Sequence, residues 1–302
     1  MKPFAIAVLM VSAGAAAQAP PVTKLTEPQD DYPAVSPDGG TILFQSNRSG
    51  SWQLWRMARD GSAIASLTSD RFNNRQPAWS PDGKTVAFST DQGLDGGRRA
   101  IWLMAAPGSA QSGAPRKLTS GAAQDVHPKW LADGSGLVFN RIAADGKQAD
   151  VFLVTLDGRE RKIELGAGLN TYASIDRSGR HLVYRGTVTE SGAGGVAENS
   201  DIFISAQDGS GKRRLTTDPA FDGWPAISPD GTKIAFASRR GSDKFRIFLM
   251  PLEGGELREV PAPAGYHYTQ PAWDPDGRSL IVYRWTADSA GETGQLVRIA
   301  LP

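Results

Sequence analysis

The 302-residue sequence contains no cysteine and only three histidines. Without cysteine the chain has neither a disulfide framework nor a lipid-attachment cysteine. It also has no H-E-x-x-H motif and no G-x-S-x-G nucleophile elbow. These absences argue against transition-metal chemistry and against an α/β-hydrolase. No Gly-rich stretch follows a strand and opens a helix, so no phosphate loop is indicated.

The sequence has almost no excess of either charge. Lys and Arg number 33 and Asp and Glu number 32. A near-neutral chain lacks the basic excess that overall attraction to nucleic acid or to an anionic membrane requires. We therefore expect no nucleic-acid partner and no stable membrane insertion.

A long apolar run is missing, but the first 19 residues resemble an export signal. Lys2 precedes the apolar run Phe4–Val11, which is shorter than the roughly 20 residues of a membrane-spanning helix. Small residues follow, and cleavage is expected after Ala17 or Ala19. The sequence thus predicts a signal peptide over residues 1–19, one domain over residues 20–302, and a periplasmic or secreted location.

What the sequence does contain is a repeat of the form Q-P-A-W-S-P-D-G. Six copies recur at separations of roughly 44 to 52 residues, a period typical of propeller blades. Proline and glycine in each copy favour a tight turn between two strands, so the repeated aspartates are interpreted as turn formers. The copies are Tyr32–Gly39, Gln76–Gly83, His127–Gly134, Tyr172–Gly179, Trp224–Gly231 and Gln270–Gly277.

The sequence around each repeat predicts a four-stranded blade. A strand follows each turn and is apolar on both faces, as in Ile42-Leu43-Phe44, which indicates cover on both sides. A third apolar strand and a short polar outer strand come next. The last repeat has no outer strand, whereas Thr23–Thr26 matches the outer strand Arg213–Thr216. We predict an all-β, six-bladed β-propeller closed by the N-terminal strand.

The Pro-Ala-Trp-Ser-Pro-Asp-Gly repeat resembles the WD40-like (PD40) repeat of the TolB family. Members of this family have an α/β domain before a six-bladed propeller and work in the periplasm within the Tol–Pal envelope system. That first domain is not expected here, because the repeats begin soon after the predicted signal. The resemblance implies a propeller that recognises a protein partner at its central mouth, of which a Pal-like lipoprotein of the cell envelope is one candidate. We also expect a monomer.

The connectivity of a meander places two kinds of loop on opposite faces of the disk. The short Pro-Asp-Gly and Asp-Gly turns share one face, which we interpret as structural. Long, varied loops share the other face with the crossings between blades, and binding is expected there. The longest are Asp91–Arg99, Ile142–Ala149, Gly186–Ser200, Arg239–Lys244 and Thr286–Gly294. We call this face the loop-rich mouth.

Two sets of residues are candidates for a site at this mouth. The first set precedes each inner strand and is mostly Asp or Asn: Asp30, Asn74, Asp125, Asn170, Asp222 and Tyr268. Such side chains shape crossing loops through backbone bonds, or they form a ring of acceptors for a partner or a Ca²⁺-like cation. No cofactor is otherwise predicted.

The second set begins each repeat and is aromatic or amide: Tyr32, Gln76, His127, Tyr172, Trp224 and Gln270. These residues suit peptide contact, or they pack beneath the loops. Arg141, Arg185 and Arg284 are candidate carboxylate or phosphate binders, or surface partners of neighbouring acids. We predict a non-catalytic protein- or peptide-binding scaffold. The alternatives are an enzyme acting on glycans or peptides, built on Asp125, His127 and Asp222, and a small-ligand or cation-binding module.

Overall fold

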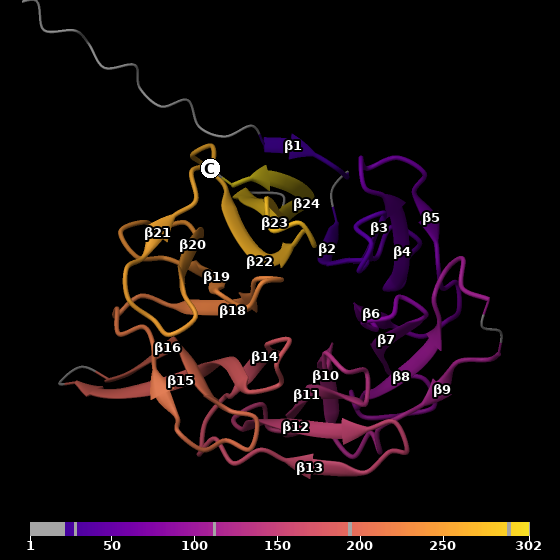
Figure 1. Ribbon diagram of the computed structural model, residues 1–302, viewed down its shortest axis with the longest axis horizontal. Coiled ribbons are helices and arrows are strands. Elements are labelled where there is room, and N and C mark those ends of the chain that lie inside the picture. Colours follow the sequence, from indigo (N-terminus) through magenta and orange to yellow (C-terminus); the bar gives the residue numbers. More distant parts are fainter. Residues whose placement is uncertain (1–21, 27–28, 111–112, 193–194, 289–290, 302) are drawn as a thin grey trace, which may run out of the picture.

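The protein is a ring of six blades around a central axis (Figure 1). The computed structural model describes residues 22–26, 29–110, 113–192, 195–288 and 291–301. Within these residues it contains 24 strands, which form six four-stranded antiparallel sheets, and no helix. The predicted fold class is therefore confirmed. The predicted signal peptide lies outside the described residues. No helix among those described is long and apolar enough to span a membrane.

Each blade runs from an inner strand at the axis to a short outer strand at the rim. Blade 1 contains β2 (Asp30–Val35), β3 (Thr41–Ser46), β4 (Gln53–Ala58) and β5 (Ala65–Ser66). Blade 2 contains β6 (Asn74–Trp79), β7 (Thr85–Thr90), β8 (Ala100–Ala105) and β9 (Arg116–Lys117). Blade 3 contains β10 (Gln124–Trp130), β11 (Gly136–Ile142), β12 (Ala149–Thr155) and β13 (Glu160–Lys162).

The second half of the ring repeats this order. Blade 4 contains β14 (Thr171–Ile175), β15 (His181–Gly192), β16 (Gly195–Ala206) and β17 (Arg213–Arg214). Blade 5 contains β18 (Asp222–Ile227), β19 (Lys233–Ser238), β20 (Arg246–Pro251) and β21 (Arg258–Glu259). Blade 6 contains β22 (His267–Trp273), β23 (Ser279–Asp288), β24 (Gly291–Ala300) and β1 (Val22–Lys24).

The N-terminal strand closes the ring, as the sequence predicted. β1 pairs antiparallel with β24, with Val22 opposite Ile299. The backbone N–H of Leu25 then donates to the Leu296 carbonyl at 2.9 Å. Pairing between the two ends of the chain removes the free edge that the last blade would otherwise present.

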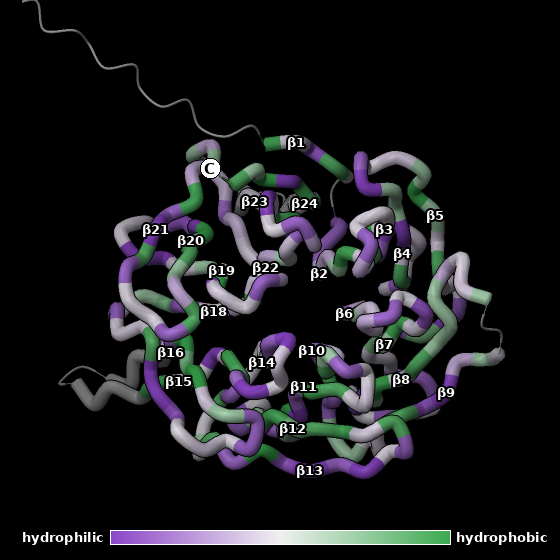
Figure 2. The backbone as a smooth tube through the Cα atoms, in the orientation of Figure 1, coloured by the Kyte–Doolittle hydropathy of each residue, from purple (hydrophilic) through white to green (hydrophobic). Residues whose placement is uncertain are grey.

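The hydrophobic core is divided among the interfaces between blades. Ile42 and Phe44 of blade 1, for example, pack in one cluster with Ile281 and Leu296 of blade 6. Ile42, Leu43 and Phe44 are all fully buried, although neighbours in a strand point to opposite faces. Figure 2 shows the same pattern in blade 3, where β12 is mostly hydrophobic and the rim strand β13 is hydrophilic. The prediction of burial on both faces is confirmed.

Two of the predicted loops are extended hairpins instead. β15 and β16 remain paired to Gly192 opposite Gly195, so most of Gly186–Ser200 is strand. β23 and β24 likewise remain paired to Asp288 opposite Gly291, which covers most of Thr286–Gly294. The prediction of loops here was wrong, because Thr and Val in the first hairpin favour continued pairing over the flexibility of its glycines. The β15–β16 hairpin projects from the ring in Figure 1.

Candidate functional site

A bulge in every inner strand positions the first residue of each repeat. In β2 the pairing with β3 shifts between Asp31 and Ala34, and the other inner strands shift at the equivalent place. Proline follows the first residue in five repeats, and because proline has no N–H the bulge costs no donor of the ladder. The first residues all have φ between 51° and 56°: Tyr32, Gln76, His127, Tyr172, Trp224 and Gln270. Non-glycine residues adopt this strained conformation only where their surroundings enforce it.

The six side chains converge on the axis, where they line a cavity of about 80 Å³. We call them the axial ring. Tyr32 Oη lies 3.1 Å from His127 Nε2 across the channel. The His127 ring centroid is 4.3 Å from that of Tyr172, which in turn is 5.5 Å from Trp224. The structure thus brings this whole predicted set together.

Amide side chains join the axial ring from blade to blade. Gln270 Oε1 accepts a hydrogen bond from the Tyr32 N–H at 2.7 Å, and Gln76 Oε1 accepts one from the His127 N–H at 3.1 Å. Gln45 and Asn140 do the same for the next blades, accepting from Gln76 N and Tyr172 N at 2.8 Å each. Sequence reasoning missed Gln45 and Asn140, although both occupy the same position in a second strand. Gln76 and Gln270 therefore also hold the bulges in place.

The Asp and Asn residues predicted before the inner strands lie at the start of these strands, except Asn170, and are buried and bonded within the fold. Arg141 Nε donates to Asp125 Oδ1 at 2.6 Å, while its NH2 group donates to Oδ2 at 2.9 Å. Arg240 NH2 donates to Asp222 Oδ2 at 2.6 Å, and Arg48 pairs with Asp30 in the same way. The predicted site residue Arg141 therefore binds an aspartate of its own blade. The remaining members bond to nearby loops: Asn74 to Asp70, Asn170 to Gly166 and Tyr268 to Pro263.

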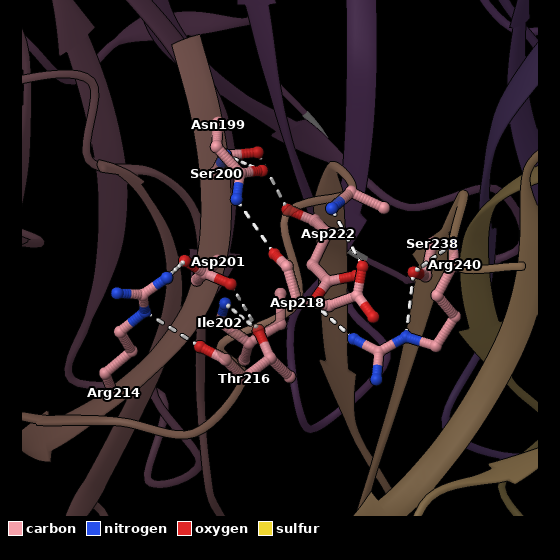
Figure 3. Close-up of polar contacts among 11 residues, drawn as sticks. Asn199, Ser200, Asp201, Ile202, Arg214, Thr216, Asp218, Asp222, Ser238 and Arg240 are labelled. Carbon is pink, nitrogen blue, oxygen red and sulfur yellow. Dashed lines mark hydrogen bonds and ion pairs between the residues drawn. The ribbon is translucent and has the colours of Figure 1, made fainter. Parts of the chain in front are cut away.

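A cluster of polar contacts lies between blades 4 and 5 (Figure 3). Asp201 and Asp222 are fully buried there, and Thr216 donates to Asp201 at 3.0 Å. Burial raises the pKa of Asp201 to about 6, although Arg214 pairs with it. Burial also raises the pKa of Asp222, which Arg240 offsets in part. Among the described residues no three His, Asp or Glu side chains gather closely enough to hold a metal ion.

Arginines supported by aromatic rings surround the loop-rich mouth. The Arg75 guanidinium lies 4.4 Å from the Trp52 ring centroid, and Arg239 lies 4.5 Å from Phe245. The predicted site residue Arg185 lies 5.1 Å from Phe221. Arg75, Arg99 and Arg239 form no ion pair with the described residues. The remaining predicted arginine, Arg284, covers Tyr266 at 4.5 Å.

Two titratable groups at the axis have strongly altered acidity. Burial raises the pKa of Asp31 to about 7, although Gln45, Arg75 and Gln270 stabilise its charged form. Burial lowers the pKa of His127 to about 3, so its imidazole is neutral at physiological pH. Asp31 was missed by sequence reasoning, because its position differs in type from blade to blade. Raised carboxyl pKa values are common at functional sites.

Asp125, His127 and Asp222, the candidate acid–base groups of an enzyme, do not contact one another in the described structure. Asp125 faces Arg141, Asp222 faces Arg240, and His127 contacts Tyr32 instead. Each carboxylate is therefore committed to an arginine in its own blade. Among the described carboxyls, Asp31 directly precedes Tyr32 of the axial ring and has its pKa raised to about 7.

Comparison with known sequences relates the chain to propeller proteins. No family model matches the chain. It is 27% identical over 269 residues to an uncharacterised protein, Atu1656, of Agrobacterium fabrum, and this match covers 84% of each chain. It is 30% identical over 222 residues to a TolB homolog of Chlorobium luteolum. That match covers 73% of this chain but only 36% of the homolog, so the chain spans about a third of that relative.

Solved structures share the fold across different activities. A structure from Agrobacterium tumefaciens assigned to TolB superposes with a TM-score of 0.67 at 22% identity, covering 93% of this chain and 97% of that one. An oligogalacturonate lyase in complex with manganese superposes with a TM-score of 0.58 at 15% identity, covering 95% and 94%. At these identities the comparison establishes the fold alone.

Proposed function

We propose, from the premise that this chain is a TolB-like six-bladed β-propeller, that it is a non-catalytic scaffold which binds a protein or peptide at the loop-rich mouth. The observation that carries the proposal is the convergence of the axial ring on one cavity. Aromatic side chains held by bulges and interblade bonds lose little conformational entropy on binding. Rigid aromatic residues near the centre of an interface supply much of its binding energy.

The charges at the mouth indicate which partner fits. Arg75, Arg99 and Arg239 surround it, and burial and the proximity of Arg99 lower the pKa of Arg75. An acidic segment of a partner would relieve this repulsion and form charge-assisted hydrogen bonds with the guanidinium groups. We therefore infer a partner segment that combines an apolar anchor with aspartate or glutamate.

The likeness to TolB supports a partner in the cell envelope. We propose that the protein acts in the periplasm and needs no cofactor, with a Pal-like lipoprotein as the first partner to test. The chain covers only part of the curated TolB homolog.

Partner capture from envelope extract tests this proposal. The triple variant Tyr172→Ala, Trp224→Ala and Arg185→Ala removes two members of the axial ring and a neighbouring cation. We expect it to lose the captured partner while it retains the thermal unfolding of a folded propeller. Lys84→Ala, on the opposite face, is the control and should retain the partner. Unchanged capture by the triple variant would reject the mouth as the binding face.

Asp31 favours a second candidate function, an enzyme acting on glycans or peptides at the same mouth. A carboxyl with a pKa of about 7 can exchange a proton near neutral pH. Turnover of a panel of glycans and peptides tests this function. Activity that is lost in Asp31→Asn but retained in Asp243→Asn would favour the enzyme. Absence of turnover together with partner capture would favour the scaffold.

A further inference from the structure

A second hollow opens on the face opposite the loop-rich mouth, among the Pro-Asp-Gly turns. Its volume is about 600 Å³, within the range of about 300–1,000 Å³ typical of ligand pockets. The turn prolines Pro37, Pro81, Pro229 and Pro275 line its opening. We call it the turn-face funnel. Uniform turns on this face were expected to be structural only, so the funnel was not foreseen.

One lysine lies where the funnel meets the axial cavity. Lys129 lines both hollows and occupies the third position of its repeat. The other five repeats have small residues there: Ala34, Ala78, Ser174, Ala226 and Ala272. These small side chains leave the channel wide enough to hold a single long side chain. Lys129 is therefore an exception among the third positions of the repeats, which are otherwise alanine or serine.

Lys129 lacks a counter-charge in the part of the chain that the structure describes. It forms no hydrogen bond or ion pair with the described residues. The residue is exposed in the channel, and desolvation by the channel walls around it lowers the pKa of its ammonium group. The funnel lining contains one further cation, Arg177, and no aspartate or glutamate. The interior of the funnel is therefore suited to an anion.

Three tryptophans make the funnel wall rigid and apolar. Trp79 Nε1 donates to the Ala34 carbonyl at 3.0 Å, and Trp130 Nε1 donates to the Ala78 carbonyl at 3.1 Å. Trp273 Nε1 donates to the Ala226 carbonyl at 3.0 Å. Each indole is thus fixed by the preceding blade and has no N–H left for a ligand. The wall can contribute apolar contact at little entropic cost.

We propose that the turn-face funnel binds the C-terminal end of a peptide, with the free α-carboxylate on Lys129 and apolar terminal side chains against the tryptophans. A glycan fits less well, because sugars require many hydrogen-bonding side chains and this lining has few. Outside the funnel, Asp38, Asp82 and Asp230 are exposed on the turns. Basic residues upstream of the peptide terminus therefore complement the rim. This site opens on the face opposite the loop-rich mouth, although the funnel and the axial cavity share Lys129 and other lining residues.

A peptide pool tests the proposal on the full chain. Acetylated hexapeptides of sequence Gly-Lys-Gly-Lys-X-X, with X drawn from apolar residues, are presented to immobilised protein as free acids and as amides. Retained peptides are identified by mass spectrometry, and the affinity of the best one is measured by fluorescence anisotropy. The variant is Lys129→Ala, which restores the residue found in four other repeats and should fold. The controls are Lys84→Ala on the same face and Arg239→Ala at the mouth.

We expect the wild-type protein to retain free acids in preference to amides. Lys129→Ala should weaken the free acid at least about tenfold, as loss of a charge-assisted hydrogen bond does, and leave the amide unchanged. Both controls should bind as wild type does. Equal retention of acid and amide, no retention at about 1 mM peptide, or equal affinity in Lys129→Ala would each overturn the proposal. Loss in Arg239→Ala alone would assign the peptide to the mouth instead.

Discussion

The backbone N–H of Tyr32 donates to Gln270 Oε1 at 2.7 Å, although 238 residues separate them. The bond joins the first blade to the last at the axis, and the pairing of β1 with β24 joins them at the rim. The ring is therefore closed at two radii. Closure at the axis positions Tyr32 toward His127, so the same contact that completes the fold also completes the axial ring.

Closure at the rim should be as strong as the pairing inside a continuous blade. Thr26 Oγ1 accepts a hydrogen bond from the Leu296 N–H at 2.9 Å, and Thr68 Oγ1 accepts one from Leu54 at the same distance. Thr26→Val leaves a buried N–H without its acceptor and should lower the free energy of unfolding by about 1–3 kcal/mol. Urea denaturation measures this loss. Thr68→Val is the matched variant within blade 1, and a Thr26→Val protein as stable as wild type would show that the N-terminal strand is not needed.

Breaking the Asp125–Arg141 pair should be one of the most destabilising changes outside the hydrophobic clusters. Asp125 is fully buried and takes two hydrogen bonds from one guanidinium group. Arg141→Ala leaves this carboxylate unpaired and should cost about 3–5 kcal/mol. Arg159→Ala is the control, because Arg159 and its partner Asp157 are both exposed and such pairs contribute about 0–1 kcal/mol. Equal losses in the two variants, measured by chemical denaturation, would contradict the burial of Asp125.

Asp31 should make the protein more stable at acid pH. Its pKa rises from 3.8 to about 7 on folding, so the folded state binds the proton more tightly than the unfolded state. The resulting stabilisation is complete below pH 3.8 and is lost as the pH rises to about 7. Asp31→Asn removes this dependence. The melting temperature of Asp31→Asn, measured relative to that of wild type, should therefore rise from pH 4 to pH 7. A constant difference across this range would refute the prediction.

His127 should have the opposite effect over an overlapping range. Its pKa falls from 6.5 to about 3 on folding, because the buried ring disfavours the imidazolium form. The neutral ring is compatible with folding above pH 6.5, and stability is lost as the pH falls toward 3. In wild type this loss opposes the gain from Asp31. The melting temperature of His127→Asn, measured relative to that of wild type, should rise as the pH is lowered. A relative rise on raising the pH would contradict the predicted direction.

The fold was accessible from the sequence because the repeat encodes it locally. Proline, aspartate and glycine specify the turn, and the strand after it is apolar on both faces in every copy. The hairpin between β15 and β16 was not predicted, because the glycines at its end were interpreted as a flexible loop and outweighed the strand-favouring Thr and Val residues before them. The N-terminal segment could be predicted as the outer strand of the last blade, since Thr23–Thr26 resembles the sequence of Arg213–Thr216.

The site was predictable only as far as side-chain position follows from the repeat. The first residues of the repeats were found because one bulge positions them all. The arginine partners were less evident, although Ser46-Asn47-Arg48 and Ser238-Arg239-Arg240 occupy equivalent places and Arg48 and Arg240 both pair with buried aspartates. Asp31 and Lys129 break the repeat, so they carried no periodic signal. Their meaning depends on burial and on neighbours that only coordinates supply.

Site-specific photo-crosslinking in the cell envelope tests the central claim most directly. A benzoylphenylalanine at position 243, beside the loop-rich mouth, reports contact on that face, and the same residue at position 233 reports on the turn face. We predict that position 243 crosslinks to a protein partner, that the crosslink disappears when Tyr172 and Trp224 are replaced by alanine, and that position 233 does not capture this partner. Capture of the same partner at position 233 and not at 243 would contradict the account.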